Sequence, residues 1–308
     1  MTESTPSHPS LPDTPRHRLV AILLVMGAAF AFTIIDAGAK WLSPRVGLVE
    51  TIWLRYLSGF VLTALFLNPL TSPGVLSSGK PKLQFLRGAL LMGATVFNFI
   101  ALQHLQLAQT VSIGFLAPLT VSLLAGPILG EWAGPRRTVA IFVGFFGVLV
   151  ITRPGFGAVH PVIVFSLMGM LSYAGVLLMT RWLSAADSPE TTMFYSALFG
   201  AVALAPVAIP LWQTPQTVLD WVVIFLIGLG GAGGHWMLIQ AQRRAEAPVL
   251  APFLYTQVIW MTLSGYFIFG DIPDRWTVIG GSIVVASGLY LLHRERIRTL
   301  ERRRRQTP

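Results

Sequence analysis

Cysteine is absent from this chain of 308 residues, and charged residues make up only 11% of it. Without cysteine, disulfides and thiolate metal sites are excluded. A soluble domain carries roughly 25% charged residues, so the low charge content and the 54% of hydrophobic residues indicate an integral membrane protein. No segment between the apolar stretches is long enough to form a soluble domain.

Several catalytic and conduction motifs are also missing. The sequence contains no Walker motif, so ATP does not drive the protein directly. It contains no HExxH motif that would indicate an intramembrane protease, and no TVGYG-like potassium filter. We therefore expect no metal and no cofactor.

Ten apolar stretches follow one another along the chain, and most approach the ~20 residues that cross a bilayer as a helix. The predicted spans are Leu19–Leu42, Val46–Leu67, Phe85–Gln103, Ala108–Leu129, Thr138–Thr152, Pro161–Leu183, Thr191–Leu211, Val218–Ala241, Pro248–Phe269 and Trp276–His293. Thr138–Thr152 is short, so we expect it either to tilt little or to include flanking residues.

The basic residues between these spans are unevenly distributed. With a cytoplasmic N-terminus, the outer loops would hold Lys40, Arg45, Arg153 and Arg275, and the other basic residues near the span ends would lie inside. This arrangement follows the positive-inside rule with both termini cytoplasmic, which requires an even number of spans. We predict a multi-pass protein of the cell inner membrane. Its net charge of +9 reflects topology, not binding of nucleic acid.

The two ends of the chain differ in composition. Residues 1–17 are rich in Pro, Ser and Thr and are predicted to be a disordered cytoplasmic N-terminus. Residues 294–308 form a basic cytoplasmic tail that is rich in arginine. We interpret the tail as a solvated anchor; contact with anionic lipid head groups is the alternative.

The sequence repeats itself at a shift of 140 positions. Phe85-Leu86-x-Gly88 recurs as Phe225-Leu226-x-Gly228, and Gly130-Glu131 recurs as Gly270-Asp271. The chain therefore divides into residues 18–153 and 159–293, each with five predicted spans. Because five is odd, the second repeat is inverted in the membrane. Inverted repeats are typical of secondary transporters, which bind substrate between the halves near the midplane.

These residues resemble the EamA-type members of the drug/metabolite transporter superfamily. In each half a helix rich in small residues is followed by a proline, Pro118 or Pro252, and by a closing glycine and acid. Asp271 departs from the glutamate usual there. The resemblance spans Leu19 to His293 and implies an all-α integral membrane protein. Its ten transmembrane helices would form two inverted five-helix repeats around a central cavity, lined mainly by the third, fourth, eighth and ninth helices. Glu131 and Asp271 are expected to cap the following helix or loop.

Four ionisable residues lie in the first two predicted spans: Asp36, Lys40, Glu50 and Arg55. A charge at the centre of a membrane helix costs roughly 2.5–3.5 kcal/mol, so it needs a partner or a cavity. We expect Lys40 to pair with Glu50, and Arg55 with Asp36. Such pairs would either lock two helices together or form a site or gate for a zwitterion. Asp36 is the deeper acid and the first candidate for a charge partner or proton site.

A glycine-dense stretch in the eighth span precedes His235 and Trp236. Close helix packing is the favoured role for the glycines. For His235 we favour a substrate-facing position together with Trp236, and a structural hydrogen bond is the alternative. Pro118 lies in the middle of the fourth span and is predicted to kink that helix.

Polar and aromatic side chains complete the candidate site. Asn98 and Gln257 would be costly against lipid, and Tyr173 belongs to the same polar and aromatic set. Phe115 and Tyr255 occupy equivalent positions in the two repeats and are expected to face each other. Such residues more often join helices, but an aromatic pocket with a few polar anchors suits a planar or amphipathic small molecule.

The leading hypothesis is a secondary transporter that moves an amino-acid-derived, zwitterionic or aromatic metabolite by alternating access. The resemblance adds uptake of riboflavin or S-adenosylmethionine as an alternative. Two other classes stay open: an intramembrane enzyme acting on a lipid-linked substrate, and a passive channel. The expected partners are a small-molecule substrate and membrane lipids, and a homodimer is compatible with the sequence.

Overall fold

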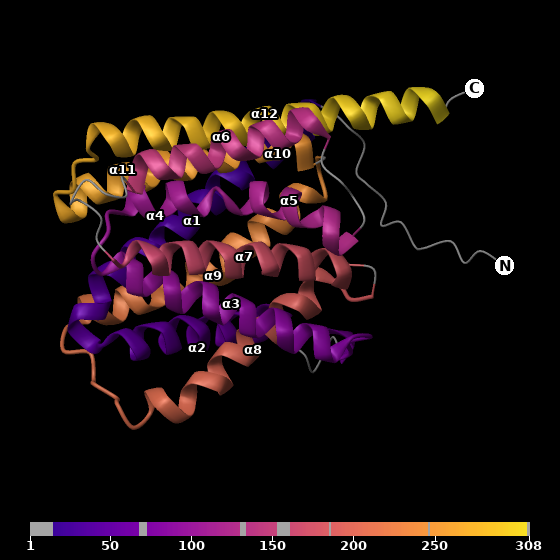
Figure 1. Ribbon diagram of the computed structural model, residues 1–308. Coiled ribbons are helices and arrows are strands. Elements are labelled where there is room, and N and C mark those ends of the chain that lie inside the picture. The colour runs from indigo at the N-terminus through magenta and orange to yellow at the C-terminus, as the bar shows by residue number, and fades with distance from the viewer. Residues whose placement is uncertain are drawn as a thin grey trace.

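The computed structural model describes residues 15–67, 73–129, 134–152, 161–184, 186–245 and 247–306. These residues form helices and short connections, and the described part of the chain contains no strand. Most of the helices run roughly side by side along one direction (Figure 1). Apolar faces of several helices remain on the outside of the bundle, as expected for a protein surrounded by lipid.

The first half contributes α1 (Pro15–Val46), α2 (Leu48–Leu67), η1 (Pro73–Leu76), α3 (Pro81–Leu102), α4 (Leu107–Gly114), α5 (Ala117–Leu129) and α6 (Pro135–Thr152). The second half contributes α7 (Ile163–Leu183), α8 (Pro189–Ala208), α9 (Val218–Gln242), α10 (Ala247–Leu254), α11 (Thr256–Phe269) and α12 (Arg275–Gln306).

Local sequence signals explain several helix ends. Gly47 separates α1 from α2 with a φ of 92°, a conformation that glycine adopts at little cost. Gly270 ends α11 in the left-handed conformation. At the start of α9, Thr217 and Asp220 form a reciprocal capping box.

Eight helical segments of the described residues are long and apolar enough to cross a membrane. One of these segments, Leu107–Pro127, includes both α4 and most of α5. Thr138–Thr152 is a shorter apolar helix, as its sequence indicated. The all-helical, multi-pass membrane architecture predicted from composition is therefore confirmed.

The predicted disordered segment at the start of the chain was too long, whereas the last predicted span, Trp276–His293, matches the apolar stretch Arg275–Arg294. α1 begins at Pro15, so residues 15–17 are helical and do not belong to a disordered segment. α12 continues past His293 to Gln306, and Figure 1 shows it extending beyond the other helices. The added turns contain many Arg and Glu residues and no Pro or Gly, so helix propensity favours their continuation. Residues 1–14, Glu131 and Arg153 lie outside the described residues.

The fourth and ninth predicted spans are each interrupted near the middle. α4 ends at Gly114, and α5 starts at Ala117, so Pro118 is the second residue of α5. The predicted kink is thus a complete break, because Pro118 lies in the first turn of α5, where its missing N–H needs no partner. The other break lies at Tyr255, between α10 and α11. Tyr255 is 140 positions after Phe115, the residue that ends α4.

The helices of the two halves pack against one another in matching pairs. α1 packs along α9 and α3 along α7, while α2 contacts α8 and α6 contacts α12. Glycine permits the closest of these contacts. A methyl group on Gly280 would overlap the carbonyl oxygen of Gly147, so α6 and α12 approach each other backbone to backbone.

Candidate functional site

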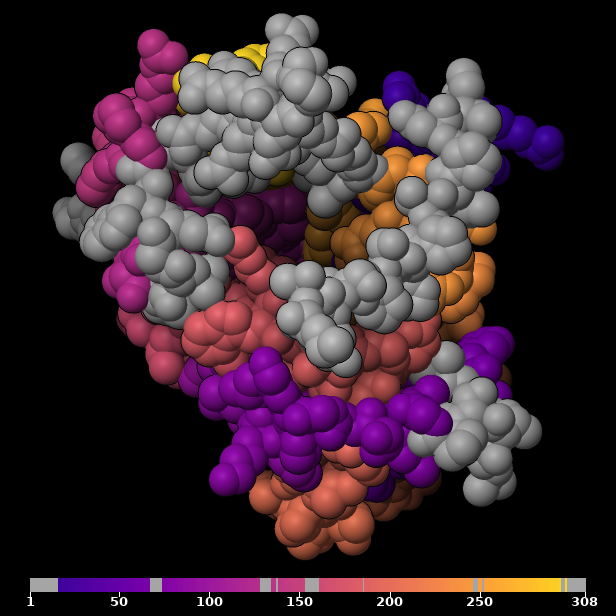
Figure 2. Space-filling model, turned by 90° about the vertical axis from the view of Figure 1, so that its right-hand side faces the viewer, coloured from indigo at the N-terminus to yellow at the C-terminus, as the bar shows by residue number. Residues whose placement is uncertain are grey.

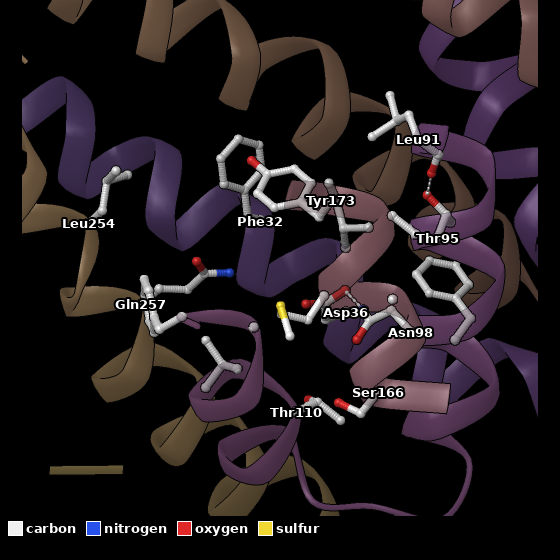
Figure 3. Close-up of a pocket in the computed structure, with 18 of the residues that line it drawn as sticks. Phe32, Asp36, Leu91, Thr95, Asn98, Thr110, Ser166, Tyr173, Leu254 and Gln257 are labelled. Atoms are coloured by element: carbon white, nitrogen blue, oxygen red, sulfur yellow. Dashed lines mark hydrogen bonds between the residues drawn. The ribbon is translucent and has the colours of Figure 1, made fainter. Parts of the chain in front are cut away.

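A cavity of about 380 Å³ lies inside the helical bundle. Its wall is formed by residues of α1, α2, α3, α4, α5, α7, α9, α10 and α11, together with Phe115 at the break between α4 and α5. Figure 3 shows Asp36, Asn98, Thr110, Ser166, Tyr173 and Gln257 around this space. Apolar side chains such as Phe32 and Leu254 make up much of the remaining wall. The cavity therefore combines an apolar surface with a few polar groups, as small-molecule sites do.

The cavity lies beneath one hollowed end of the bundle. Figure 2 views the end at which α12 finishes, and a hollow is visible there between the salmon segments near α7 and the orange segments of the second half. Purple segments of the first half form the visible floor of this hollow. The cavity wall includes Leu177 of α7 and Leu238 of α9, which both lie toward this end of their helices.

Asp36 is held on α1 with its carboxylate in the cavity wall. Asn98 of α3 donates a hydrogen bond from Nδ2 to Oδ1 of Asp36 over 3.0 Å (Figure 3). The expected ion pair between Asp36 and Arg55 is absent from the described residues. Asp36 is thus held by a neutral amide, and its charge faces the cavity.

Arg55 of α2 lines the same cavity. Its guanidinium lies 4.8 Å from the centre of the Tyr56 ring, and its buried Nε has no hydrogen-bond partner. No ion pair joins Arg55 to another described residue. Removing a polar group from water without a new partner is unfavourable, so this guanidinium is available to a ligand.

Lys40, one turn along α1 from Asp36, has a different environment from the predicted one. Its Nζ donates to Oδ2 of Asp271 over 2.7 Å and to the carbonyl oxygen of Leu105 over 3.1 Å. The predicted pair with Glu50 was therefore wrong. The expected capping role of Asp271 was also wrong, since Asp274 accepts the hydrogen bond from the backbone N–H of Thr277 at the start of α12. The pair lies near the start of α12, at the end of the bundle opposite the hollow.

Glu50 does not line the cavity. It is only 3% exposed and lies in the first turn of α2, with its carboxylate folded against Gly47. A carboxylate is favourable there because backbone N–H groups without helical partners give the helix start a partial positive charge. This position suits a role in starting α2 after the Gly47 turn.

Phe115 and Tyr255 meet at the two helix breaks. Their ring centroids are 4.4 Å apart and the rings are inclined by 32°, so the two residues face each other as their equivalent positions suggested. Phe115 lines the cavity. Tyr255 is largely covered, and its hydroxyl packs tightly against Gly288 of α12. The aromatic contact thus joins the broken helices behind the cavity wall.

Adjacent residues of α9 have opposite orientations. His235 lines the cavity and its ring packs 5.2 Å from that of Phe32. Trp236 is 53% exposed and is not part of the cavity wall, so its predicted place in the site was wrong. Successive helical residues point about 100° apart, which here places His235 toward the cavity and Trp236 away from it. Gly230 and Gly234 pack against α1, which agrees with the packing role proposed for the glycines.

Tyr173, Gln257 and Pro118 also line the cavity.

Sequence reasoning missed Arg87, which is half-buried in α3. Its Nε donates to Oγ1 of Thr180 over 2.7 Å, and its Nη1 donates to Oγ of Ser196. The sequence did contain a charged residue here, two positions after the start of the predicted span at Phe85. Because α3 begins earlier, at Pro81, Arg87 lies further inside the helix than the predicted span indicated.

A polar cluster joins two loops at the hollowed end of the bundle. The carboxylate of Asp187, between α7 and α8, accepts hydrogen bonds from Ser78 Oγ, the Gly79 N–H and Gln84 Nε2 at 2.5–2.7 Å. Burial alone would raise the pKa of Asp187, but these hydrogen bonds and nearby Lys80 hold it below its ordinary value of 3.8. The ionised carboxylate therefore fastens the chain before α3 to the turn before α8.

Comparison with known proteins places this architecture among transporters. The chain is 27% identical over 268 residues to an S-adenosylmethionine uptake transporter of Rickettsia prowazekii, covering 86% of this chain and 89% of the relative. It is 25% identical to a riboflavin transporter of Vibrio cholerae, covering 89% and 93%. It is 29% identical to the pseudopaline exporter CntI of Pseudomonas aeruginosa, covering 88% and 95%.

A solved crystal structure superposes on the fold with a TM-score of 0.59 at 18% identity, covering 93% of this chain and 98% of the other. The sequence model of the EamA-like transporter family matches twice in succession, over residues 19–153 and 160–293. These matches include both halves and nearly all of the described helices. The protein is therefore a member of the EamA-like transporter family, a multi-pass membrane transporter of small molecules and not an enzyme.

Proposed function

We propose that this protein is a secondary carrier for a zwitterionic, amino-acid-derived metabolite, working by alternating access. The observation that supports this most strongly is the pair of opposite charges in the cavity wall, the carboxylate of Asp36 and the guanidinium of Arg55, which attract each other but make no direct ion pair. Ionisable residues that face a cavity within a membrane protein are typical of substrate and ion pathways. A substrate with both an ammonium or sulfonium group and a carboxylate would supply partners to both.

We further propose ten membrane spans in two inverted repeats. In this arrangement α4 with α5, and α10 with α11, each cross the membrane once as a broken helix. The matching pairs of helices and the two breaks 140 positions apart support this interpretation. Broken helices at the substrate site are frequent in transporters built from inverted repeats.

The structure suits the state that is open toward the cytoplasm, if both chain ends lie on that side. The hollow opens at the end where α12 finishes, whereas Lys40, Asp271 and the carbonyl of Leu105 join three segments at the other end. In our proposal this connection closes the outer side, and it must separate when the carrier opens outward. Transport would thus alternate between breaking and reforming the Lys40–Asp271 pair.

The relatives narrow the substrate class. S-adenosylmethionine carries a sulfonium, an ammonium, a carboxylate and an aromatic base, so it matches the charges and the apolar wall of the cavity. Riboflavin is the second candidate, because the Phe115 ring lines the cavity and suits stacking on a flat ring system. A neutral flavin would leave Asp36 and Arg55 unpaired, so we favour the zwitterion.

Counterflow in proteoliposomes tests this function. Vesicles containing the protein are preloaded with unlabelled S-adenosylmethionine, or with riboflavin, and a trace of the labelled compound is added outside. A carrier gives transient accumulation of label above equilibrium, and Asp36→Asn vesicles should show none. Label entry that is linear and independent of preloading for both compounds would contradict the proposal and indicate a channel.

A further inference from the structure

A second, smaller cavity of about 70 Å³ adjoins the main one. Arg55, Leu91 and His235 line both spaces, so the smaller cavity is a side chamber of the candidate site. Its remaining wall comes from α2, α3, α8 and α9 and includes Arg87, Ser196 and Gly231. The side chamber is large enough for a carboxylate in place of a few water molecules.

Arg55 and Arg87 both line this chamber, and neither makes a direct ion pair with an acid among the described residues, although Asp36 is close enough to attract Arg55. Arg55 makes no hydrogen bond through its buried Nε. Arg87 donates only to the neutral hydroxyl groups of Thr180 and Ser196. These hydroxyls fix the Arg87 side chain on two neighbouring helices but do not neutralise its charge.

The charges of the two connected spaces do not balance. Asp36 is the acid of the main cavity, and Arg55 and Arg87 are the two bases, while Lys40 and Asp271 pair with each other outside it. One more negative group is needed to bring the two spaces to neutrality. Guanidinium groups bind carboxylates through two parallel hydrogen bonds, which makes arginine well suited to that group.

We propose that the side chamber is the anion subsite of the carrier, in which Arg55 and Arg87 bind the carboxylate of the substrate. This inference rests on the proposed transport of a zwitterion, whose cationic group would lie at Asp36 in the main cavity. His235 lines both spaces and would stand beside the middle of the bound molecule. Gly231 has no atom within 4 Å of the position that a side chain would occupy, so it leaves the chamber open.

The subsite predicts a preference that can be measured with matched ligands. S-adenosylmethionine, arginine and tryptophan each have a partner that lacks only the carboxylate: decarboxylated S-adenosylmethionine, agmatine and tryptamine. We would measure binding of all six compounds to the purified full-length protein by ligand-dependent thermal stabilisation. For an acid that binds, the affinity should exceed that of its partner by roughly tenfold to a hundredfold, the range for a hydrogen bond to a charged group.

Substitutions assign this preference to the two arginines. Arg87→Gln and Arg55→Gln should each reduce the acid-over-amine ratio toward one, and Arg45→Gln should leave it unchanged. Arg45 is a matched control because it is exposed at the end of α1, where its guanidinium stacks on Trp41. If Arg87→Gln fails to fold, Arg55→Gln still decides, because the Arg55 guanidinium donates no hydrogen bond to a described residue that the substitution would remove.

The outcomes separate this inference from the transport proposal. A wild-type protein without preference for any acid, a preference retained in both variants, or no stabilisation by any acid would overturn the subsite. Counterflow of the same compounds is scored separately. Acid-selective binding without counterflow would contradict transport and leave the subsite intact. Equal counterflow of acids and their decarboxylated partners would support transport and contradict the subsite.

Discussion

Asp36 and Lys40 lie one turn apart on α1, yet their surroundings differ. Lys40 has an acidic partner, Asp271, and a backbone carbonyl, and the three groups connect separate segments of the chain. Asp36 receives one hydrogen bond from an amide and otherwise faces the cavity. A charge that the protein itself neutralises belongs to the machinery that holds or closes the bundle. A charge left without a partner is available to a ligand.

Replacing Asp36 with Asn should have the largest effect on transport. The substitution preserves shape and a polar contact with Asn98 but removes the charge that would pair with the substrate cation. Loss of one partner from a buried ion pair costs roughly 3–5 kcal/mol, so transport should fall at least a hundredfold, as measured by counterflow. Asp187→Asn, which lies outside the cavity, serves as the matched control, and unchanged kinetics in Asp36→Asn would remove Asp36 from the site.

Breaking the Lys40–Asp271 pair should have a smaller effect, chiefly on stability and on the balance between states. Lys40→Ala or Asp271→Ala leaves one partly buried charge without its partner, which should cost roughly 1–3 kcal/mol. The thermal stability of purified protein measures this loss. The double exchange Lys40→Asp with Asp271→Lys should recover part of the loss, and no recovery would show that the pair interaction is not what stabilises this end.

His235 and Trp236 are neighbours on α9, but His235 lines the cavity and Trp236 is exposed, so their substitutions should have different effects on transport. His235→Ala should change the apparent affinity for substrate about threefold to tenfold, the range for one neutral hydrogen bond or packing contact. Trp236→Ala should change it less than about twofold, because this side chain faces outward. Saturation curves for transport measure both, and equal effects from the two substitutions would contradict the orientation assigned to α9.

The smallest effect concerns Asp187, which is fully partnered like Lys40 but lies at the other end of the bundle. Because its pKa is lowered in the folded protein, its contribution to stability is present above pH ~4 and is lost as the pH falls through the folded value. Asp187→Asn should therefore lower the free energy of unfolding at neutral pH by less than about 1 kcal/mol, because solvent screens this partly exposed carboxylate. The melting temperature measures this loss. The difference from wild type should shrink below pH ~4, and a difference independent of pH would contradict this assignment.

Much of the architecture could be predicted from the sequence because composition determines which segments enter a membrane. The apolar stretches, the short Thr138–Thr152 helix and the helical membrane fold all follow from hydrophobicity alone. The break at Phe115 could be anticipated from Pro118. The break at Tyr255 could not, because Val258 occupies the position equivalent to Pro118.

Contacts between distant segments were harder to predict. Lys40 and Asp271 are 231 residues apart, and no local pattern indicates that their ends of the bundle meet. Glu50 was the nearer acid in sequence, but the Gly47 turn folds its carboxylate back onto the start of α2. Arg87 escaped notice because it lies near a helix end in the sequence, and only the packing of α3 against α7 and α8 gives it polar neighbours.

The most direct test of the account is the side from which the cavity can be reached. Since the chain lacks cysteine, Thr110→Cys on the cavity wall provides a single reactive group, and membrane-impermeant thiol reagents can be applied to vesicles of either orientation. Labelling should be at least tenfold faster from the side of the chain ends, and adding Lys40→Ala should accelerate labelling from the opposite side. Equal labelling rates from both sides, unaffected by loss of the Lys40–Asp271 pair, would contradict alternating access.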